Sequence, residues 1–335
     1  MTQFVKDLSE FALIDRLISA LPAAARGTES VAGQQDDCAY WSTMPGRAVV
    51  TTDALVDGVH FRLDWTDWRS LGHKMLAVNL SDLASMGSTP TIALVTLALT
   101  GEESVAGLEE MYRGAGELAA TYPIAIAGGD IVRTPGPMTI SVTAFGFVSD
   151  RDRLMLRSES KPDDVIMVSG TLGASAAGLQ LLQEDQRSAA TAELLIGAHL
   201  RPSPRISLGQ KLAAAGVRCC MDLSDGLSGD LPKILSASGV GARIDLDKIP
   251  VLPAVRALFP TEWQELALHG GEDYELLCTV PPEIVGGVIA QAESIGATLT
   301  PIGQIVPGDL LQYCLDGEPL QVREKGAWDH FGGRA

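Results

Sequence analysis

The stretch TTDALVDGVHF, residues 51–61, directly follows the apolar run AVV at 48–50. A β-branched run that ends in an acid is typical of a buried strand, so we expect a strand that presents the Asp53 carboxylate at its end. Asp57 and Gly58 predict a turn after that strand, and His60 follows between two apolar residues. Alone, the stretch indicates only a strand with an acidic end.

Apolar segments that carry an acid recur along the chain. They are QQDDCA at 34–39, NLSDLASMG at 79–87, AIAGGDIVR at 125–133, MDLSDGL at 221–227 and GGEDYELL at 270–277. Carboxylates that converge repel one another unless protons or cations hold them together, and Mg²⁺ prefers such oxygen ligands. The recurrence favours a site with several metal ions, built from Asp37, Asp53, Asp82, Asp130 and Asp222, with the hydroxyls of Thr51, Thr52 and Ser224 beside them.

Two other interpretations compete with a metal site. Any single aspartate in such a setting is more often a helix cap or a turn residue. A carboxylate pair for glycoside hydrolysis would use only two of the acids and leave the rest unexplained.

Composition and charge narrow the class of protein. The chain has 335 residues, of which 46% are hydrophobic, so it is globular and long enough for two domains. Its net charge of −17 disfavours a nucleic-acid or anionic-membrane partner. No secretory signal precedes Asp7, no apolar run reaches about 20 residues, and the five cysteines form no CxxC pair. We expect a soluble cytoplasmic protein with reduced thiols.

Periodicity predicts alternating strands and helices, and therefore an α/β or α+β fold. The chain becomes charged and aperiodic near 150–161, so we expect two domains, 1–150 and 151–335. Helices are expected at 4–21, from a Ser70 cap to about 86, from a capping box at 100–103 to 118, then through 182, to about 215, at 223–235 and at 284–295. Strands are expected at 92–99, 124–127, 138–148, 165–169, 217–221, 242–246, 274–280 and 299–305.

Common phosphate-binding motifs are absent. The chain has no GxxxxGK[ST] and no GxGxxG after a strand, which disfavours a P-loop kinase and a dinucleotide-dependent dehydrogenase. The turn at 170–173 stands between a strand and a helix. It has the form of a backbone phosphate site, and a plain tight turn is the alternative.

The full set of strings resembles the thiamine-monophosphate kinase family, within the superfamily of aminoimidazole ribonucleotide synthetase-like ATP-dependent enzymes. The resemblance covers nearly the whole chain. It rests on DDCA at 36–39, TTDALVDGVHF at 51–61, KMLAVNLSDLASMG at 74–87, GGD at 128–130, LRS at 156–158, SGTLGASAAGL at 169–179, MDLSDGL at 221–227, GGEDYELL at 270–277 and GAWDHFG at 326–332. No single string is decisive, but their order and spacing together are highly specific.

The resemblance implies ATP- and Mg²⁺-dependent phosphorylation of thiamine monophosphate to thiamine diphosphate. It implies a two-domain fold, with a mixed-sheet N-terminal domain that pairs in a homodimer and a C-terminal α/β domain that completes the ATP and substrate site. The implied Mg²⁺ ligands are Asp37, Thr51, Thr52, Asp53, Asp82, Asp130, Asp222 and Asp225, with Asp37 preferred over Asp36. The implied ATP contacts are Tyr112, Gly129, Asp130, Arg157 and Ser224, and the implied substrate contacts are His60, Glu272 and Trp328. Among these, Asp130, Asp222 and Arg157 are expected to act in catalysis.

Phosphoryl transfer needs positioning and neutralisation of charge more than covalent chemistry. The attacking monoester oxygen is already largely ionised near neutral pH, so we expect direct in-line transfer without a phosphoenzyme. A planar Arg157 fork would add charge stabilisation.

Four of these residues also have a plain structural alternative. His60 could be a partly buried histidine, Glu272 a turn residue, Arg157 a partner in a surface ion pair, and Trp328 an anchor of the C-terminus on the core. Two functional alternatives remain. One is another enzyme of the same superfamily, acting on a purine intermediate or selenide, and the other is a nucleotide- or cation-binding regulator without catalysis.

Overall fold

The computed structural model describes residues 3–26, 31–32, 40–41, 46–122, 124–149, 154–187 and 190–320. The predictions for Asp36, Asp37 and Trp328 fall outside these described residues. Two compact units are present. We call Met1–Leu83 with Ser88–Ser149 the N-terminal unit, and Ala84–Gly87 with Asp150–Ala335 the C-terminal unit. Over the part of the chain that is described, no helix has the length and apolar character to cross a membrane.

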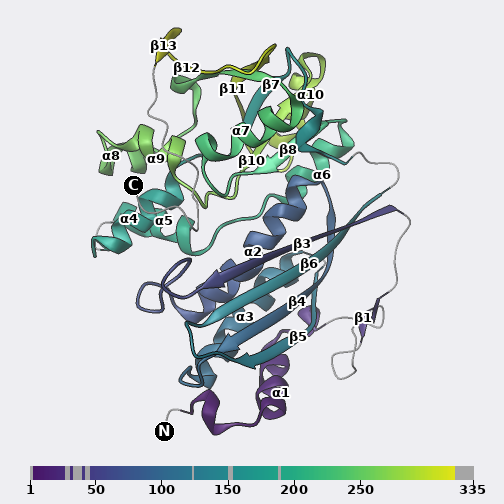
Figure 1. The fold of residues 1–335 in the computed structure, drawn as a ribbon, viewed down its shortest axis with the longest axis vertical. Coiled ribbons are helices and arrows are strands. Elements are labelled where there is room, and N and C mark those ends of the chain that lie inside the picture. The colour runs from purple at the N-terminus through teal and green to yellow at the C-terminus, as the bar shows by residue number, and fades with distance from the viewer. Residues whose placement is uncertain are drawn as a thin grey trace. The chain divides into compact units, whose positions relative to one another are not determined.

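A four-stranded sheet forms the N-terminal unit, with the strand order β3-β6-β4-β5 (Figure 1). The β3–β6 and β6–β4 pairs are antiparallel, whereas the β4–β5 pair is parallel. The predicted mixed sheet is therefore confirmed. The strands are β3 (Gly46–Val56), β4 (Thr89–Leu99), β5 (Ala125–Arg133) and β6 (Thr139–Ser149), and a separate short pair joins β1 (Val31–Ala32) to β2 (Tyr40–Trp41).

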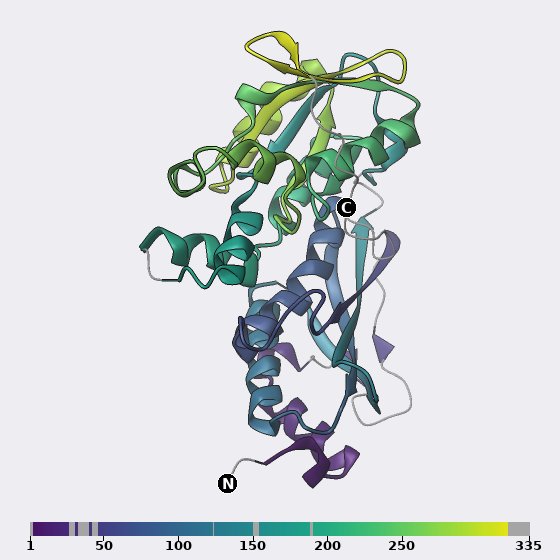
Figure 2. The ribbon, with the colours of Figure 1, turned by 60° about the vertical axis from the view of Figure 1, so that its left-hand side comes forward.

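One face of this sheet is covered by helices and the other is open. Helices α2 (Trp68–Ser85) and α3 (Val105–Thr121) lie against the covered face, and α1 (Glu10–Ala20) packs on α3 (Figure 2). Side chains alternate along the strands, so that Val95 and Val142 are buried under the helices. On the open face, the Val50 side chain at the edge strand is 61% exposed.

The starts of two helices differ from the sequence prediction. Asp67, and not Ser70, caps α2, because the Asp67 carboxylate accepts the backbone N–H of Ser70 at 2.8 Å and its hydroxyl at 2.7 Å. The expected capping box does form contacts, since Glu103 accepts the Thr100 N–H at 2.8 Å. These contacts close a turn, however, and α3 begins only after the N-cap Ser104.

Asp53 was expected at the end of its strand and Asp130 beyond the strand at 124–127, and both expectations were wrong. Asp53 lies inside β3, which continues to Val56, and Asp130 lies inside β5. Asp130 lies on the open face, where polar residues are tolerated, whereas Asp53 faces the helices beside Asp82 and Thr51, so an acid after an apolar run does not by itself mark the end of a strand. The predicted turn at Gly58 is present, with φ +81°.

The C-terminal unit contains a seven-stranded sheet, with the order β13-β12-β9-β11-β7-β10-β8. Within this sheet, only the β12–β9 pair is parallel among the described strands. The strands are β7 (Val165–Ser169), β8 (Cys219–Asp222), β9 (Gly241–Asp245), β10 (Leu276–Val280), β11 (Leu299–Val306), β12 (Leu311–Leu315) and β13 (Glu318–Leu320).

Helices accompany this sheet and enclose two apolar cores. They are α4 (Ala174–Gln183), α5 (Ala190–Leu200), α6 (Ile206–Ala214), α7 (Leu227–Ser238), α8 (Pro253–Leu258), α9 (Trp263–His269) and α10 (Val285–Glu293). One core packs α7 on the sheet through residues such as Leu231 and Ile244, and the other joins α4, α5 and α8 around Leu195. Helix α5 was not predicted. The helix expected at 223–235 begins at Leu227, because 223–226 form a turn.

Candidate functional site

In the N-terminal unit, an acidic pair lies between the sheet and α2. Thr51 and Asp53 are two residues apart on β3 and face the helices, where Asp82 projects from α2. The Thr51 hydroxyl donates a hydrogen bond to the Asp82 carboxylate. The Asp53 carboxyl group also interacts with that of Asp82, and a hydrogen bond between two carboxyl groups requires a proton on one of them, which the two then share.

Burial and the neighbouring acid make Asp53 hard to ionise. Burial, followed by the charge and the hydrogen bond of Asp82, raises the pKa of Asp53 to about 6. A bound cation would remove this cost, because it would replace the shared proton. Two carboxylates and a hydroxyl provide only oxygen donors, which is the set that Mg²⁺ prefers. The residues present therefore fit Mg²⁺.

Two other predicted ligands lie on the opposite, open face of the same sheet. Thr52 alternates with Asp53, and its hydroxyl donates to the Val142 carbonyl oxygen at 3.1 Å. Asp130 is exposed on β5 and aligns with Ala54 through the residues paired across β6 and β4, one position past the row of Asp53. Three strand spacings separate the two acids, about 14 Å. A single ion cannot contact the side chains of Asp53 and Asp130 in one chain.

A register shift in β5 sets the side on which Asp130 lies. Ala93 pairs with Ile126, but the next residue, Leu94, pairs with Gly128, so Ala127 is an extra residue in this ladder. The neighbouring Gly129 packs so closely on β4 that a Cβ there would overlap the Val95 carbonyl oxygen. Gly129 is therefore required for strand packing, whatever else it contacts.

The remaining predicted residues of the N-terminal unit have structural partners. The turn after β3 holds His60, whose Nδ1 accepts the Val56 N–H at 3.1 Å, so the ring proton of the neutral form is on Nε2. Tyr112 is buried on α3, and burial raises the pKa of its hydroxyl. His60 lies beside the end of the strand that carries Asp53.

In the C-terminal unit, the structure joins two of the acidic segments directly. The segment after β8 and the segment before β10 lie side by side, because Ser224 accepts the Glu272 N–H at 2.8 Å and Leu223 accepts the Tyr274 N–H at 2.9 Å. These bonds bring Asp222, Ser224, Asp225 and Glu272 into one neighbourhood. The structure thus brings Glu272 beside three predicted residues that precede it in the sequence by about 50 positions.

Asp230, which the sequence analysis did not single out, holds this turn. Its carboxylate accepts the backbone N–H groups of Ser224 and Asp225, both at 2.9 Å. Lys233 bridges Asp225 at 2.6 Å and Asp230 at 2.7 Å. Burial alone would lower the pKa of Lys233, but its two carboxylate partners outweigh burial and raise it.

Asp273 occupies the turn considered as a phosphate site. Its carboxylate accepts the N–H of Gly173 at 2.6 Å and of Ser175 at 3.1 Å, at the start of α4. Burial raises the pKa of Asp273 to about 7, against the lowering effect of these bonds. The 170–173 turn therefore binds a carboxylate of its own chain, which is the tight-turn alternative.

Arg157 and the four described cysteines complete the predicted set. Arg157 has an exposed side chain and begins a short 3₁₀ turn, Arg157–Glu159. The backbone carbonyl of Arg157 accepts a hydrogen bond from the Ser238 hydroxyl at 2.8 Å. Cys219, Cys220, Cys278 and Cys314 are free and buried, in agreement with reduced thiols. Within the described ranges, no three His, Cys, Asp or Glu side chains gather closely enough to form a metal site by themselves.

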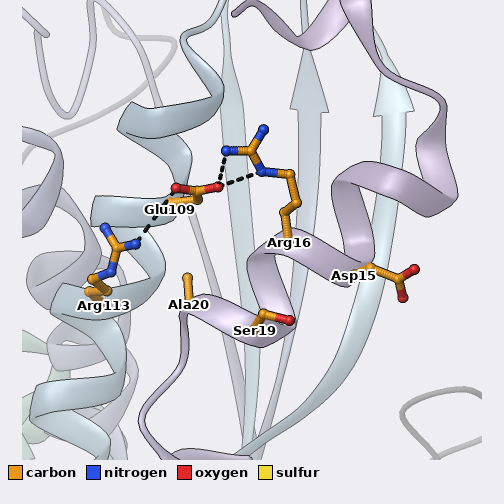
Figure 3. A pocket seen from close by; sticks show the side chains of 6 residues that line it. All are labelled: Asp15, Arg16, Ser19, Ala20, Glu109 and Arg113. Carbon is orange, nitrogen blue, oxygen red and sulfur yellow. Dashed lines mark hydrogen bonds and ion pairs between the residues drawn. The ribbon is translucent and has the colours of Figure 1, made fainter.

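A hollow of about 270 Å³ between α1 and α3 is lined by none of the predicted residues. Figure 3 shows Arg16 and Arg113 reaching Glu109 from opposite sides. The Arg16–Glu109 contact is 2.5 Å, so this carboxylate already neutralises the arginine nearest to it. The hollow therefore lies beside an ion pair that joins α1 to α3.

Comparisons with known proteins identify the family. The model of the AIR synthase related protein N-terminal domain matches residues 35–148, and that of the AIR synthase related protein C-terminal domain matches 161–313. The thiamine-monophosphate kinase of Escherichia coli (strain K12) is 42% identical over 329 residues, which cover 96% of this chain and 98% of the relative.

Two solved structures extend the comparison to the fold. The thiamine-monophosphate kinase of Stenotrophomonas maltophilia K279a has 38% identity and a TM-score of 0.82, over 93% of this chain and 98% of its own. AaThiL complexed with AMPPCP and TMP has 30% identity and a TM-score of 0.76, over 99% and 100%. The described fold, its acidic segments and these full-length similarities lead to one conclusion: the chain belongs to the thiamine-monophosphate kinase family of the AIR synthase related proteins.

Proposed function

We propose that this chain transfers the γ-phosphoryl group of ATP to thiamine monophosphate, giving thiamine diphosphate and ADP. The observation that carries the proposal is the 42% identity to a thiamine-monophosphate kinase over nearly the full length of both chains. A relative of 30% identity is described in complex with AMPPCP and TMP, which supports the same pair of substrates. The acidic pair on β3 and α2 supplies the chemical reason for a cation.

Mg²⁺ is the cation that we propose for the acidic pair. Thr51, Asp53 and Asp82 would hold it, and the Thr51 hydrogen bond keeps the Asp82 carboxylate turned toward Asp53. When bound, Mg²⁺ offsets the negative charge of the nucleotide phosphates. The further ligands that we propose are Asp37, Thr52, Asp130, Asp222 and Asp225.

The proposed substrate contacts belong to both units. We assign ATP to Tyr112, Gly129, Asp130, Arg157 and Ser224, and thiamine monophosphate to His60, Glu272 and Trp328. Residues 1–150 would bind metal and nucleotide, and 151–335 would complete the site. Asp130, Asp222 and Arg157 are the proposed catalytic groups. The monoester oxygen attacks in its ionised form, so transfer is direct and no residue is phosphorylated.

We also propose a cytoplasmic homodimer. The open face of the β3-β6-β4-β5 sheet carries Val50 at 61% exposure and Val132 at 44% exposure, and a second copy of the chain would cover these apolar side chains. The buried, free cysteines support a reducing compartment.

Product analysis of the purified protein tests the function. With ATP, Mg²⁺ and thiamine monophosphate, we expect thiamine diphosphate and ADP in equal amounts, with loss of both products in Asp82→Asn. Asp309→Asn is the matched control, because Asp309 is an exposed aspartate of the C-terminal unit outside the proposed site. ADP without thiamine diphosphate, or a phosphorylated aspartate or histidine formed during turnover, would refute the proposed reaction.

A further inference from the structure

Glu272 stands in a backbone conformation that most residues avoid. Its φ is +65°, in the left-handed region, and its N–H is tied to the Ser224 carbonyl at 2.8 Å. Non-glycine residues adopt this conformation at a cost that the surrounding structure must offset, and such residues concentrate at functional sites. The backbone at Glu272 is therefore fixed, and the direction of its carboxylate depends on what holds the side chain.

His199 on α5 is the group that meets this carboxylate. The His199 side chain is 5% exposed, and its Nδ1 lies 3.3 Å from Oε2 of Glu272. The same Nδ1 lies 3.1 Å from the Ser175 hydroxyl. An ionised carboxylate only accepts hydrogen bonds, so a hydrogen bond from His199 to an ionised Glu272 requires a proton on Nδ1.

Ser175 closes the arrangement into a ring. Its backbone N–H donates to Asp273 at 3.1 Å, while its hydroxyl contacts His199. Asp273 directly follows Glu272 in the chain, so Glu272, Asp273, Ser175 and His199 form a closed circuit of contacts, which we call the Glu272 ring. Because α4 and α5 both contribute to it, the ring ties the carboxylate to the helical core of the unit.

We propose that His199 is a positioning residue for thiamine monophosphate, acting through Glu272. The inference rests on the proposed function, which assigns Glu272 to this substrate. His199 contributes no proton to the transferred group. It fixes the rotamer of Glu272 before the substrate arrives, so its loss weakens substrate binding more than it slows phosphoryl transfer.

Steady-state kinetics of matched variants test the proposal. His199→Leu keeps the bulk but removes the ring nitrogen, and we expect the KM for thiamine monophosphate to rise about tenfold. The kcat and the KM for ATP should stay within about threefold. His199→Asn places an amide nitrogen near the Nδ1 position and should recover most of the loss. His269→Leu is the control, because His269 also contacts a serine hydroxyl through Nδ1, at 2.6 Å, but on Ser228.

A double-mutant cycle tests whether His199 acts through Glu272. In Glu272→Gln, adding His199→Leu should change the KM for thiamine monophosphate by less than about twofold. Additive effects in this cycle would overturn the proposal. So would an equal rise of both KM values in His199→Leu, or a failure of His199→Asn to rescue. If His199→Leu does not fold, which thermal unfolding would reveal, Ser175→Ala, which removes the hydroxyl that contacts His199, carries the same cycle.

A measurement without substrate separates this inference from the proposed function. The ¹⁵N resonance of His199 Nδ1 should report a protonated nitrogen in the native chain and shift in Glu272→Gln. An unchanged resonance would refute the contact itself. If the wild type makes no thiamine diphosphate but its His199 resonance differs from that of Glu272→Gln as expected, the proposed substrate is refuted and the Glu272 ring is not.

Discussion

Replacing Asp53 by Asn should change how the stability of the metal-free protein depends on pH. In the folded chain, burial and Asp82 raise the pKa of Asp53 to about 6, from an ordinary value of 3.8. Between these values the folded state keeps a proton that the unfolded chain has lost. The stabilisation from this proton is therefore complete below pH 3.8 and is lost as the pH rises through 6.

The size of the effect follows from the two pKa values. The difference between about 6 and 3.8 corresponds to about 3 kcal/mol over the whole range. Between about pH 4.5 and pH 7, linkage leaves about 2 kcal/mol to be lost. Asn does not titrate and keeps nearly the same volume.

Equilibrium urea unfolding after chelation is the assay. The free energy of unfolding of the wild type relative to Asp53→Asn should fall by about 2 kcal/mol from pH 4.5 to pH 7. Saturating Mg²⁺ at pH 7 should stabilise the wild type alone, by about 3 kcal/mol at 100 times its Kd. Asp309→Asn, an exposed aspartate outside the proposed site, serves as the control. A difference between wild type and Asp53→Asn that stays constant with pH would refute the reasoning.

Three further predictions concern packing and buried charges. Gly129→Ala should destabilise the chain by about 3 kcal/mol in urea unfolding, because its Cβ would overlap the backbone of β4, whereas Gly136→Ala, whose nearest neighbour is 3.5 Å away, should cost little. Asp230→Ala should raise the KM for ATP about tenfold, because it releases two backbone N–H groups of the Ser224 turn, and an unchanged KM would contradict that role. Arg205→Met should lower the unfolding free energy by about 3 kcal/mol, because Glu275 is buried and paired with this guanidinium, and a stability equal to wild type would argue against the pair.

Local pattern predicted the fold well where one element decides its own structure. The strand at 165–169 was predicted with its observed bounds, because a β-branched apolar run of this length suits a buried strand and is too short for a buried helix. The caps were harder. Asp67 and Ser70 are both good N-cap residues three positions apart, and only the observed bonds decide between them.

The candidate site could be predicted by residue type but not by arrangement. The sequence pointed to Asp53, Asp82 and Thr51, which the structure brings together. It could not reveal that Asp273 caps a helix about 100 residues earlier, or that His199 reaches Glu272. Such contacts depend on tertiary packing, and the one available signal was the density of acids in GGEDYELL, of which only the first had been given a role.

The single extra residue in β5 has a consequence for comparing members of the family. Side chains along a strand alternate between the two faces of the sheet. Without the shift at Ala127, Asp130 would pair with Leu97, and its carboxylate would lie on the same face as that of Asp53. One extra residue therefore places the two acids on opposite faces of the sheet. A relative that has the GGD sequence but lacks this insertion would place the same carboxylate on the other face of the sheet. The role of this aspartate in a relative must therefore be judged from the strand register as well as from residue identity.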